Sequence, residues 1–330
     1  MSKMMKRGIL MFLLLISVSA GIIYYTIDLE ALKTIRSFNA VSLLLALLAL
    51  TLGMYFDGLR LQRLVKIGGY KLSIQAVLRV IFSNYFMAML TPGASGGAVA
   101  QVLVLKSYGV PLGKGTPIVL IRTVFSIMFL VVMLPFVFLH DAIEIPYISR
   151  NMLLVFAVVA VIATLLGTYI LQTKYMRQFV YRLAKYFKED KTKDWLSKLE
   201  TLNQGLGLLY KKPGQSIVVF FESGLSLLCL YCIAPALMYA FTSDIHIIDV
   251  LDRMILLNLT LYFAPTPGGT GIAEGLFVVL FGSFVPAGTV GIVAVAWRVV
   301  AEYLPFFIGM YAVLTLYGRQ FVAQETSHEQ

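Results

Sequence analysis

The sequence predicts an all-α, polytopic membrane protein, and three observations support this prediction. Hydrophobic residues make up 59% of the 330 residues and charged residues only 13%, with a mean hydropathy of +0.84. Apolar runs of about 20 residues, the length that crosses the hydrocarbon core of a bilayer, recur along the chain. Lys and Arg gather in alternate polar segments, as the positive-inside rule requires. A soluble domain cannot bury this much apolar side chain, so a membrane protein is the class that remains.

Six apolar runs are long enough to form spanning helices: 8–27, 41–59, 116–139, 151–171, 215–241 and 289–316. The first run reaches a "SVSA" sequence that also fits a signal peptide, but its apolar part continues to Ile27 and favours an uncleaved helix. Two further stretches, 74–106 and 250–284, are apolar but interrupted by Pro and Gly. Each is too long for one simple crossing, and its arms are short for spans, so we expect two re-entrant hairpins.

The basic residues predict the orientation of these segments. If the N-terminus is cytoplasmic and both interrupted stretches are re-entrant, 20 Lys and Arg fall on the cytoplasmic side and 4 on the outer side. We therefore expect a multi-pass protein of the cell membrane with both termini in the cytoplasm. The net charge of +10 is then explained by topology and not by nucleic-acid binding.

A single membrane domain over residues 1–330 is expected to contain two halves. The first half covers 8–139 and includes the hairpin 74–106; the second covers 215–320 and includes the hairpin 250–284. Between them, the polar segment 172–213 is expected to be an amphipathic cytoplasmic linker whose basic residues face anionic headgroups or water. At roughly 40 residues, this linker is too short for a catalytic domain.

The two interrupted stretches resemble each other in sequence. "TPGASGG" begins at Thr91 and "TPGGTGI" at Thr266. Each copy has an Asn before the motif and an Arg on the next long helix: Asn84 and Arg122 in the first, Asn258 and Arg298 in the second. From Thr to Arg the interval is 31 residues in one copy and 32 in the other. Because the predicted orientation makes the copies enter from opposite sides, the sequence predicts an inverted repeat of the transporter type.

Pro and Gly have a physical reason to stand in these motifs. Non-helical backbone at membrane depth is tolerated only inside protein or against a water-filled cavity. Proline ends a helical arm and glycine allows unusual dihedrals and close approach. The helices that follow would present their positive N-terminal ends to a phosphate or carboxylate; tight turns without a ligand are the alternative. The loop residues concerned are Thr91, Pro92, Gly93, Gly96, Gly97, Thr266, Pro267, Gly268, Gly269 and Gly271.

Charged residues inside apolar spans need a partner or a function, because burying a charge in the bilayer is costly. Arg298 and Glu302 are four residues apart, so they can pair on one helix face, and Glu274 could reach the same place. A polar path for a charged headgroup and a structural ion pair both fit these residues. The other candidates for this path are Arg122, Asn84, Asn258 and Gln101; Asp57 and Glu222 lie near span ends and are expected at the interface.

Signatures of catalysis are missing from the sequence. It contains no Walker loop, no Ser/His/Asp set and no paired metal-binding acids, and "GGTGIAEG" lacks the βαβ context of a dinucleotide fingerprint. Cys229 and Cys232 form a CxxC in the middle of a span, where helix packing explains them better than redox chemistry. The sequence therefore predicts no enzyme, no cofactor, no metal site and no nucleic-acid partner.

The motifs "NYFMAMLTPGASGGAVAQVLVLKSYGV", "APTPGGTGIAEGLFVVL" and "WRVVAEYLPFFIGMY" resemble the membrane region of lysylphosphatidylglycerol synthases, a flippase-like family with stand-alone members. The resemblance covers about 8–320; many relatives carry an acidic residue where this chain has Ala98. It implies movement of aminoacylated phosphatidylglycerol or another polar lipid between leaflets. Because no soluble synthase domain is present, translocation without synthesis is the expectation.

We therefore expect a lipid translocase that is passive or ion-coupled. Arg298, with Glu274 and Glu302, would hold a headgroup from the outer half of the membrane, and Arg122 from the inner half. Membrane phospholipids would be its partners; a homo-oligomer and a separately encoded lipid-modifying enzyme are also compatible with the sequence. The alternatives are a membrane subunit of an enzyme acting on lipid-linked substrates, a small-solute transporter or channel, and a non-transporting scaffold.

Overall fold

The computed structural model describes residues 39–91, 95–140, 150–170, 207 and 212–328, and every regular element in these ranges is helical. The helices are α2 (Ala40–Ile67), α3 (Ile74–Leu90), α4 (Ser95–Ser107), α5 (Leu112–His140), α6 (Arg150–Ile170), α9 (Pro213–Tyr231), α10 (Ile233–Met238), α11 (Ile247–Leu261), α12 (Ile272–Phe281), α13 (Val290–Arg298) and α14 (Leu304–His328). A π-helical turn over Val299–Tyr303 joins α13 to α14.

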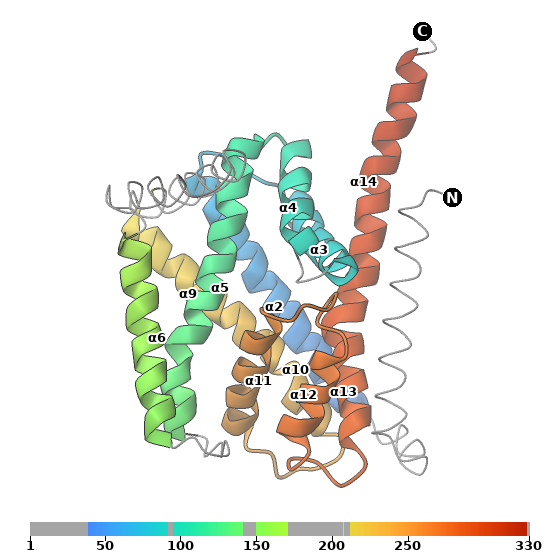
Figure 1. Ribbon diagram of the computed structural model, residues 1–330. Helices are drawn as coiled ribbons and strands as arrows, with labels where there is room; N and C mark the ends of the chain where they lie inside the picture. Colours follow the sequence, from blue (N-terminus) through green and yellow to red (C-terminus); the bar gives the residue numbers. More distant parts are fainter. Residues whose placement is uncertain (1–38, 92–94, 141–149, 171–206, 208–211, 329–330) are drawn as a thin grey trace. The chain divides into compact units, whose positions relative to one another are not determined.

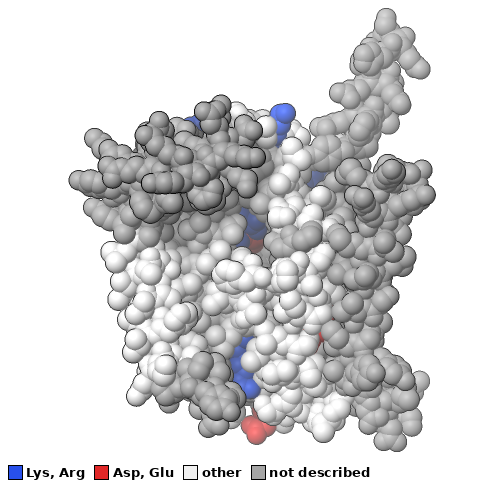
Figure 2. Space-filling model, viewed as in Figure 1, with Lys and Arg blue, Asp and Glu red and all other residues white. Residues whose placement is uncertain are grey.

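Four stretches of the described chain are long and apolar enough to cross a membrane: Ala40–Ile67, Leu112–His140, Pro213–Met238 and Val290–Leu316. They contain or overlap four of the predicted spans, and the predicted span 151–171 corresponds to α6, an apolar helix of 21 residues. Much of the described surface is uncharged (Figure 2), with large exposed side chains such as Phe156 and Val159. The prediction of a polytopic helical membrane protein is confirmed; the predicted span 8–27 and most of the linker 172–213 lie outside the described residues.

Two predicted spans are less regular than expected. The run 215–241 is not one helix, because α9 ends at Tyr231 and α10 begins at Ile233, with Pro235 in the first turn of α10. Proline is tolerated in a first turn, where its missing N–H is not needed. The run 289–316 is helical from Val290 onward but contains the π-helical turn directly after Arg298.

The chain forms two compact units that are not contiguous in sequence. Among the described residues, unit 1 contains 39–55, 74–91, 95–104 and 228–328, and unit 2 contains 56–73, 105–140, 150–170, 207 and 212–227. Unit 1 therefore holds α3, nearly all of α4, and α10 to α14. Unit 2 holds α5, α6 and most of α9, and the long helix α2 contributes its first part to unit 1 and its second part to unit 2.

Unit 1 is built on a close contact between α3 and α14, which lie side by side in Figure 1. Gly309 of α14 lies directly against the backbone of α3, since a Cβ at this position would be 2.1 Å from the carbonyl oxygen of Phe82. The rings of Phe86 and Phe306 pack next to it, with centroids 5.3 Å apart. Only glycine fits here, as at the small-residue contacts typical of membrane helices.

This contact predicts that Gly309→Ala is destabilising. The added methyl group meets backbone, which cannot rotate away, so we expect the free energy of unfolding to fall by about 1–3 kcal/mol. Gly275→Ala in α12 is the matched control, because a Cβ there meets nothing within 4 Å, and helix propensity alone favours that change by up to about 1 kcal/mol. Thermal unfolding of both variants in detergent measures the difference; equal stabilities would show that α3 and α14 separate easily.

Each predicted hairpin consists of two short helices. α3 and α4 have 17 and 13 residues, and α11 and α12 have 15 and 10, all below the roughly 20 residues of a full crossing. The loop between α11 and α12 contains three residues with positive φ, at Gly268, Gly269 and Gly271. A Cβ at Gly268 would lie 3.4 Å from the Cα of Met89, so within unit 1 this loop touches the end of α3. Entry from opposite membrane faces stays a prediction.

Unit 2 packs α5 against α6 and α9. Aromatic rings of α5 and α9 form its core: the centroids of Phe125 and Phe129 lie 6.2 Å and 5.9 Å from that of Phe220. Gly224 of α9 lies beneath the Phe129 ring, because a Cβ there would be 2.2 Å from the ring atom Cε2. A glycine on α9 thus lets the two helices approach around an aromatic cluster.

Candidate functional site

Arg298 is the centre of a charged cluster in unit 1, which we call the Arg298 cluster and define as Arg298, Glu274 and Glu302. Arg298 is the last residue of α13 and only 1% exposed. Its Nε donates to Glu274 Oε1 at 2.9 Å, and its Nη1 lies 3.2 Å from Glu302 Oε1. Its Nη2 donates to the carbonyl oxygen of Gly268 at 3.0 Å. The structure thus brings together three of the predicted residues and the second Gly loop.

Glu274 holds this cluster to the loop. Its second carboxylate oxygen, Oε2, accepts a hydrogen bond from the Gly271 N–H at 2.7 Å, and this N–H belongs to the N-terminal end of α12. The sequence had suggested that a ligand anion would take this end of the helix. In the structure the chain's own carboxylate lies there, which is the stabilising arrangement for a helix N-terminus.

The glycines of the second loop make this geometry available. Gly268, Gly269 and Gly271 have φ values of 59°, 66° and 83°, which a residue with a Cβ rarely adopts. This backbone turns the Gly268 carbonyl toward Arg298 and the Gly271 N–H toward Glu274. Beside them, the Thr266 hydroxyl oxygen is buried and has no hydrogen-bond partner among the described residues, and the Thr270 hydroxyl lies 3.4 Å from Arg298 Nη2.

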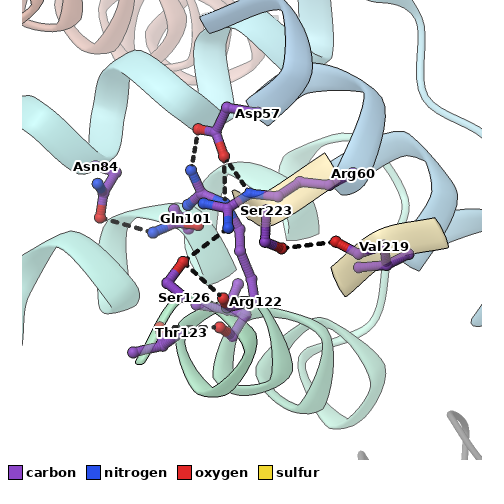
Figure 3. A network of polar contacts seen from close by, with 10 residues as sticks. Asp57, Arg60, Asn84, Gln101, Arg122, Thr123, Ser126, Val219 and Ser223 are labelled. Carbon is purple, nitrogen blue, oxygen red and sulfur yellow. Dashed lines mark hydrogen bonds and ion pairs between the residues drawn. The ribbon is translucent and has the colours of Figure 1, made fainter. Parts of the chain in front are cut away.

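The first loop is organised by Asn84. Gln101 Nε2 donates to Asn84 Oδ1 at 2.7 Å (Figure 3), and the Gly96 N–H donates to the Thr91 hydroxyl at 2.8 Å. A Cβ at Gly97 would be 2.4 Å from Asn84 Oδ1, so glycine is needed for α4 to approach α3. Pro92 and Gly93 lie outside the described residues.

The asparagine of the second copy behaves differently from that of the first. Asn258 Nδ2 donates to the Met254 carbonyl of its own helix at 2.9 Å, one turn earlier. Asn84, in contrast, joins two helices through Gln101. The two asparagines therefore occupy matching places in the sequence but make different hydrogen bonds. Among the described residues, no hydrogen bond joins Asn258 to the Arg298 cluster.

A second charged cluster lies in unit 2 around Asp57. Arg122 of α5 donates two hydrogen bonds to the Asp57 carboxylate, one of them from Nε to Oδ1 at 3.2 Å. Arg60 Nε donates to the same oxygen, and Arg60 Nη1 donates to the Ser126 hydroxyl at 2.7 Å (Figure 3). All four side chains are buried. Arg122 therefore resembles Arg298 in pairing with a carboxylate from another helix.

The sequence reasoning missed the partners of two carboxylates in unit 2, Asp57 and Glu222. Asp57, expected at the interface, is 3% exposed and buried against two arginines. Glu222 accepts hydrogen bonds from both Nε and Nη2 of Arg63, at 3.0 Å and 2.7 Å, which joins α9 to α2. The i, i+3 spacing of Asp57 and Arg60 inside an apolar helix was the available signal, because such spacing places both on one face.

Among the described residues, no group of three or more His, Cys, Asp or Glu side chains could hold a metal ion. Cys229 and Cys232 are free thiols on α9 and just beyond it.

Together, short paired helices, buried charge clusters and long apolar helices define a multi-pass integral membrane protein with polar groups placed inside its helical units. The chain belongs to the family described as lysylphosphatidylglycerol synthase TM region, whose model matches residues 10–309. It is also similar to a UPF0104 membrane protein of Archaeoglobus fulgidus, with 24% identity over 311 residues, which cover 90% of this chain and 93% of that protein.

Proposed function

We propose that this protein is a lipid translocase that moves a lipid with a polar or charged headgroup between the two leaflets of the cell membrane. Membership of a family named after the membrane region of a lipid synthase makes a lipid the natural substrate class. Aminoacylated phosphatidylglycerol is the first lipid to test within this class.

The observation that carries the proposal is the Arg298 cluster. A guanidinium that is 1% exposed, inside an apolar span, costs several kcal/mol to place there unless it is paired or used. Arg298 contacts two carboxylates and also binds the backbone of the loop between α11 and α12, although one carboxylate would neutralise its charge. Broken helices whose polar backbone meets charged side chains form the binding sites of many transporters.

Reconstitution into liposomes tests this function. Purified protein is incorporated into vesicles that contain fluorescently labelled phosphatidylglycerol, lysyl-phosphatidylglycerol or, as the zwitterionic control, phosphatidylcholine. A membrane-impermeant quencher then reports how much label changes leaflet with time. We expect faster exchange than in protein-free vesicles for at least one charged lipid, because a buried charged site discriminates by headgroup charge. Exchange equal to that of protein-free vesicles for all three lipids would reject the proposal and favour an accessory subunit or scaffold.

A further inference from the structure

The two carboxylates of the Arg298 cluster differ in how firmly they are held. Glu274 is 4% exposed at its side chain and uses both oxygens, one for Arg298 Nε and one for the Gly271 N–H. The Glu302 side chain is 25% exposed, and its contact with Arg298 Nη1 spans 3.2 Å. That contact has no hydrogen-bond geometry: Arg298 Nη1 is buried without a hydrogen-bond partner among the described residues.

The formal charges of the Arg298 cluster indicate why the two carboxylates differ. One guanidinium faces two carboxylates, so the three groups carry a formal charge of −1 when both glutamates are ionised. Glu274 alone neutralises Arg298 with good geometry. A second ionised carboxylate in an apolar span is costly and is tolerated when it can take up a positive charge. Glu302 is the group that can do so without breaking the contacts of the loop.

Few other titratable groups near Glu302 could take up this positive charge in its place. Arg298 of α13 attracts the Glu302 carboxylate, and Glu274 of α12 repels it. In the same turn as Glu302, Tyr303 interacts electrostatically with Arg298. Within 304–316 of α14 the titratable side chain is Tyr311. Glu302 also lies on the π-helical turn, a distortion that is frequent at functional sites.

We propose that Glu302 is a reversible proton-binding site, and that its loading and unloading couples leaflet exchange to the proton gradient. With a proton on one carboxylate oxygen of Glu302, the cluster is an ion pair plus a neutral acid and is compatible with apolar surroundings. When the proton leaves to water, the cluster carries a net negative charge, which favours a conformation open to water. Proton binding stands by itself, whereas the coupling rests on the proposed function.

The first arm of the test needs no transport. Infrared difference spectra of the purified full-length protein, between acidic and neutral buffer, record the C=O band of carboxyl groups that gain a proton. Glu302→Gln keeps the size of the side chain and should lose one such band. Glu302→Asp should keep a shifted band, and Asp244→Asn, a change at an exposed acid, should keep the Glu302 band. A spectrum of Glu302→Gln identical to that of the wild type overturns the proposal, and size-exclusion profiles confirm that each variant is folded.

The second arm imposes a pH difference across proteoliposomes that contain labelled phosphatidylglycerol or lysyl-phosphatidylglycerol. If one proton moves per lipid, the steady-state leaflet ratio shifts by up to about tenfold per pH unit. We expect this shift in the wild type and in Asp244→Asn, and its loss in Glu302→Gln. If Glu302→Gln loses its infrared band but the pH difference does not change lipid exchange by the wild type, the coupling is overturned. If Glu302→Gln loses its band and the wild type exchanges no lipid, the proton site is supported and the proposed function is rejected.

Discussion

Arg298→Ala should reduce leaflet exchange of the transported lipid to the level of protein-free vesicles. The substitution removes the cation that Glu274 and Glu302 share and frees the Gly268 carbonyl. Breaking a buried ion pair by deleting one partner costs about 3–5 kcal/mol, because the remaining charge is buried without compensation. We therefore expect a loss of stability together with the loss of exchange, and both are measured on the same reconstituted samples.

A double variant separates these two effects. Arg298→Gln combined with Glu274→Gln removes both charges of the tighter pair and keeps side chains of similar size that can still form hydrogen bonds. Replacing both members of a buried pair is much less costly than removing one. Glu302 then has no cation beside it, but its side chain is 25% exposed and can be solvated, so the double variant should be clearly more stable than Arg298→Ala and still inactive in exchange. Exchange at the wild-type rate in the stable double variant would assign Arg298 a purely structural role.

Asp57→Asn should be among the most destabilising single substitutions in unit 2. The Asp57 carboxylate accepts hydrogen bonds from Arg60 and Arg122, and all three side chains are buried. Without it the two guanidinium groups face each other in an apolar interior. We expect the free energy of unfolding to fall by about 3–5 kcal/mol, as for other buried pairs that lose one partner. Thermal unfolding in detergent and the yield of monodisperse protein measure the effect.

Glu222→Gln is the matched control for this experiment. It also neutralises a carboxylate bonded to an arginine of α2, but the Arg63 side chain is 36% exposed and can be solvated. Partly exposed ion pairs contribute about 0–1 kcal/mol, so the loss of stability should be several times smaller than for Asp57→Asn. Equal losses in the two variants would mean that burial does not determine the strength of these pairs.

The sequence predicted contacts within one helix or one motif better than contacts between distant helices. Arg298 and Glu302 are four residues apart, so helix geometry alone indicated their pairing. Glu274 follows the second Gly loop, and its place in the sequence made an approach to Arg298 and Glu302 a reasonable expectation. Asp57 and Arg122 are joined across 65 positions, and one sequence contains no information on which face of α2 meets α5.

Local distortions were also beyond the sequence reasoning. The π-helical turn at Val299–Tyr303 is followed by Pro305, which has no N–H to donate to the Ala301 carbonyl of that turn; such a proline predicts a kink but not the type of turn. Similarly, the break at Cys232 separates α9 from α10 inside a run whose hydrophobicity alone indicates one continuous span.

The number of residues between Arg298 and Gly309 is fixed by contacts at both ends. At one end Arg298 binds Glu274 and the Gly268 carbonyl. At the other end only glycine fits at position 309, against the backbone of Phe82. Adding or removing one residue between them would turn one end by about 100° relative to the other, since a helix has 3.6 residues per turn. A substitution inside this interval changes one contact at a time, whereas an insertion or deletion would disconnect the charged cluster from the α3 contact in one step.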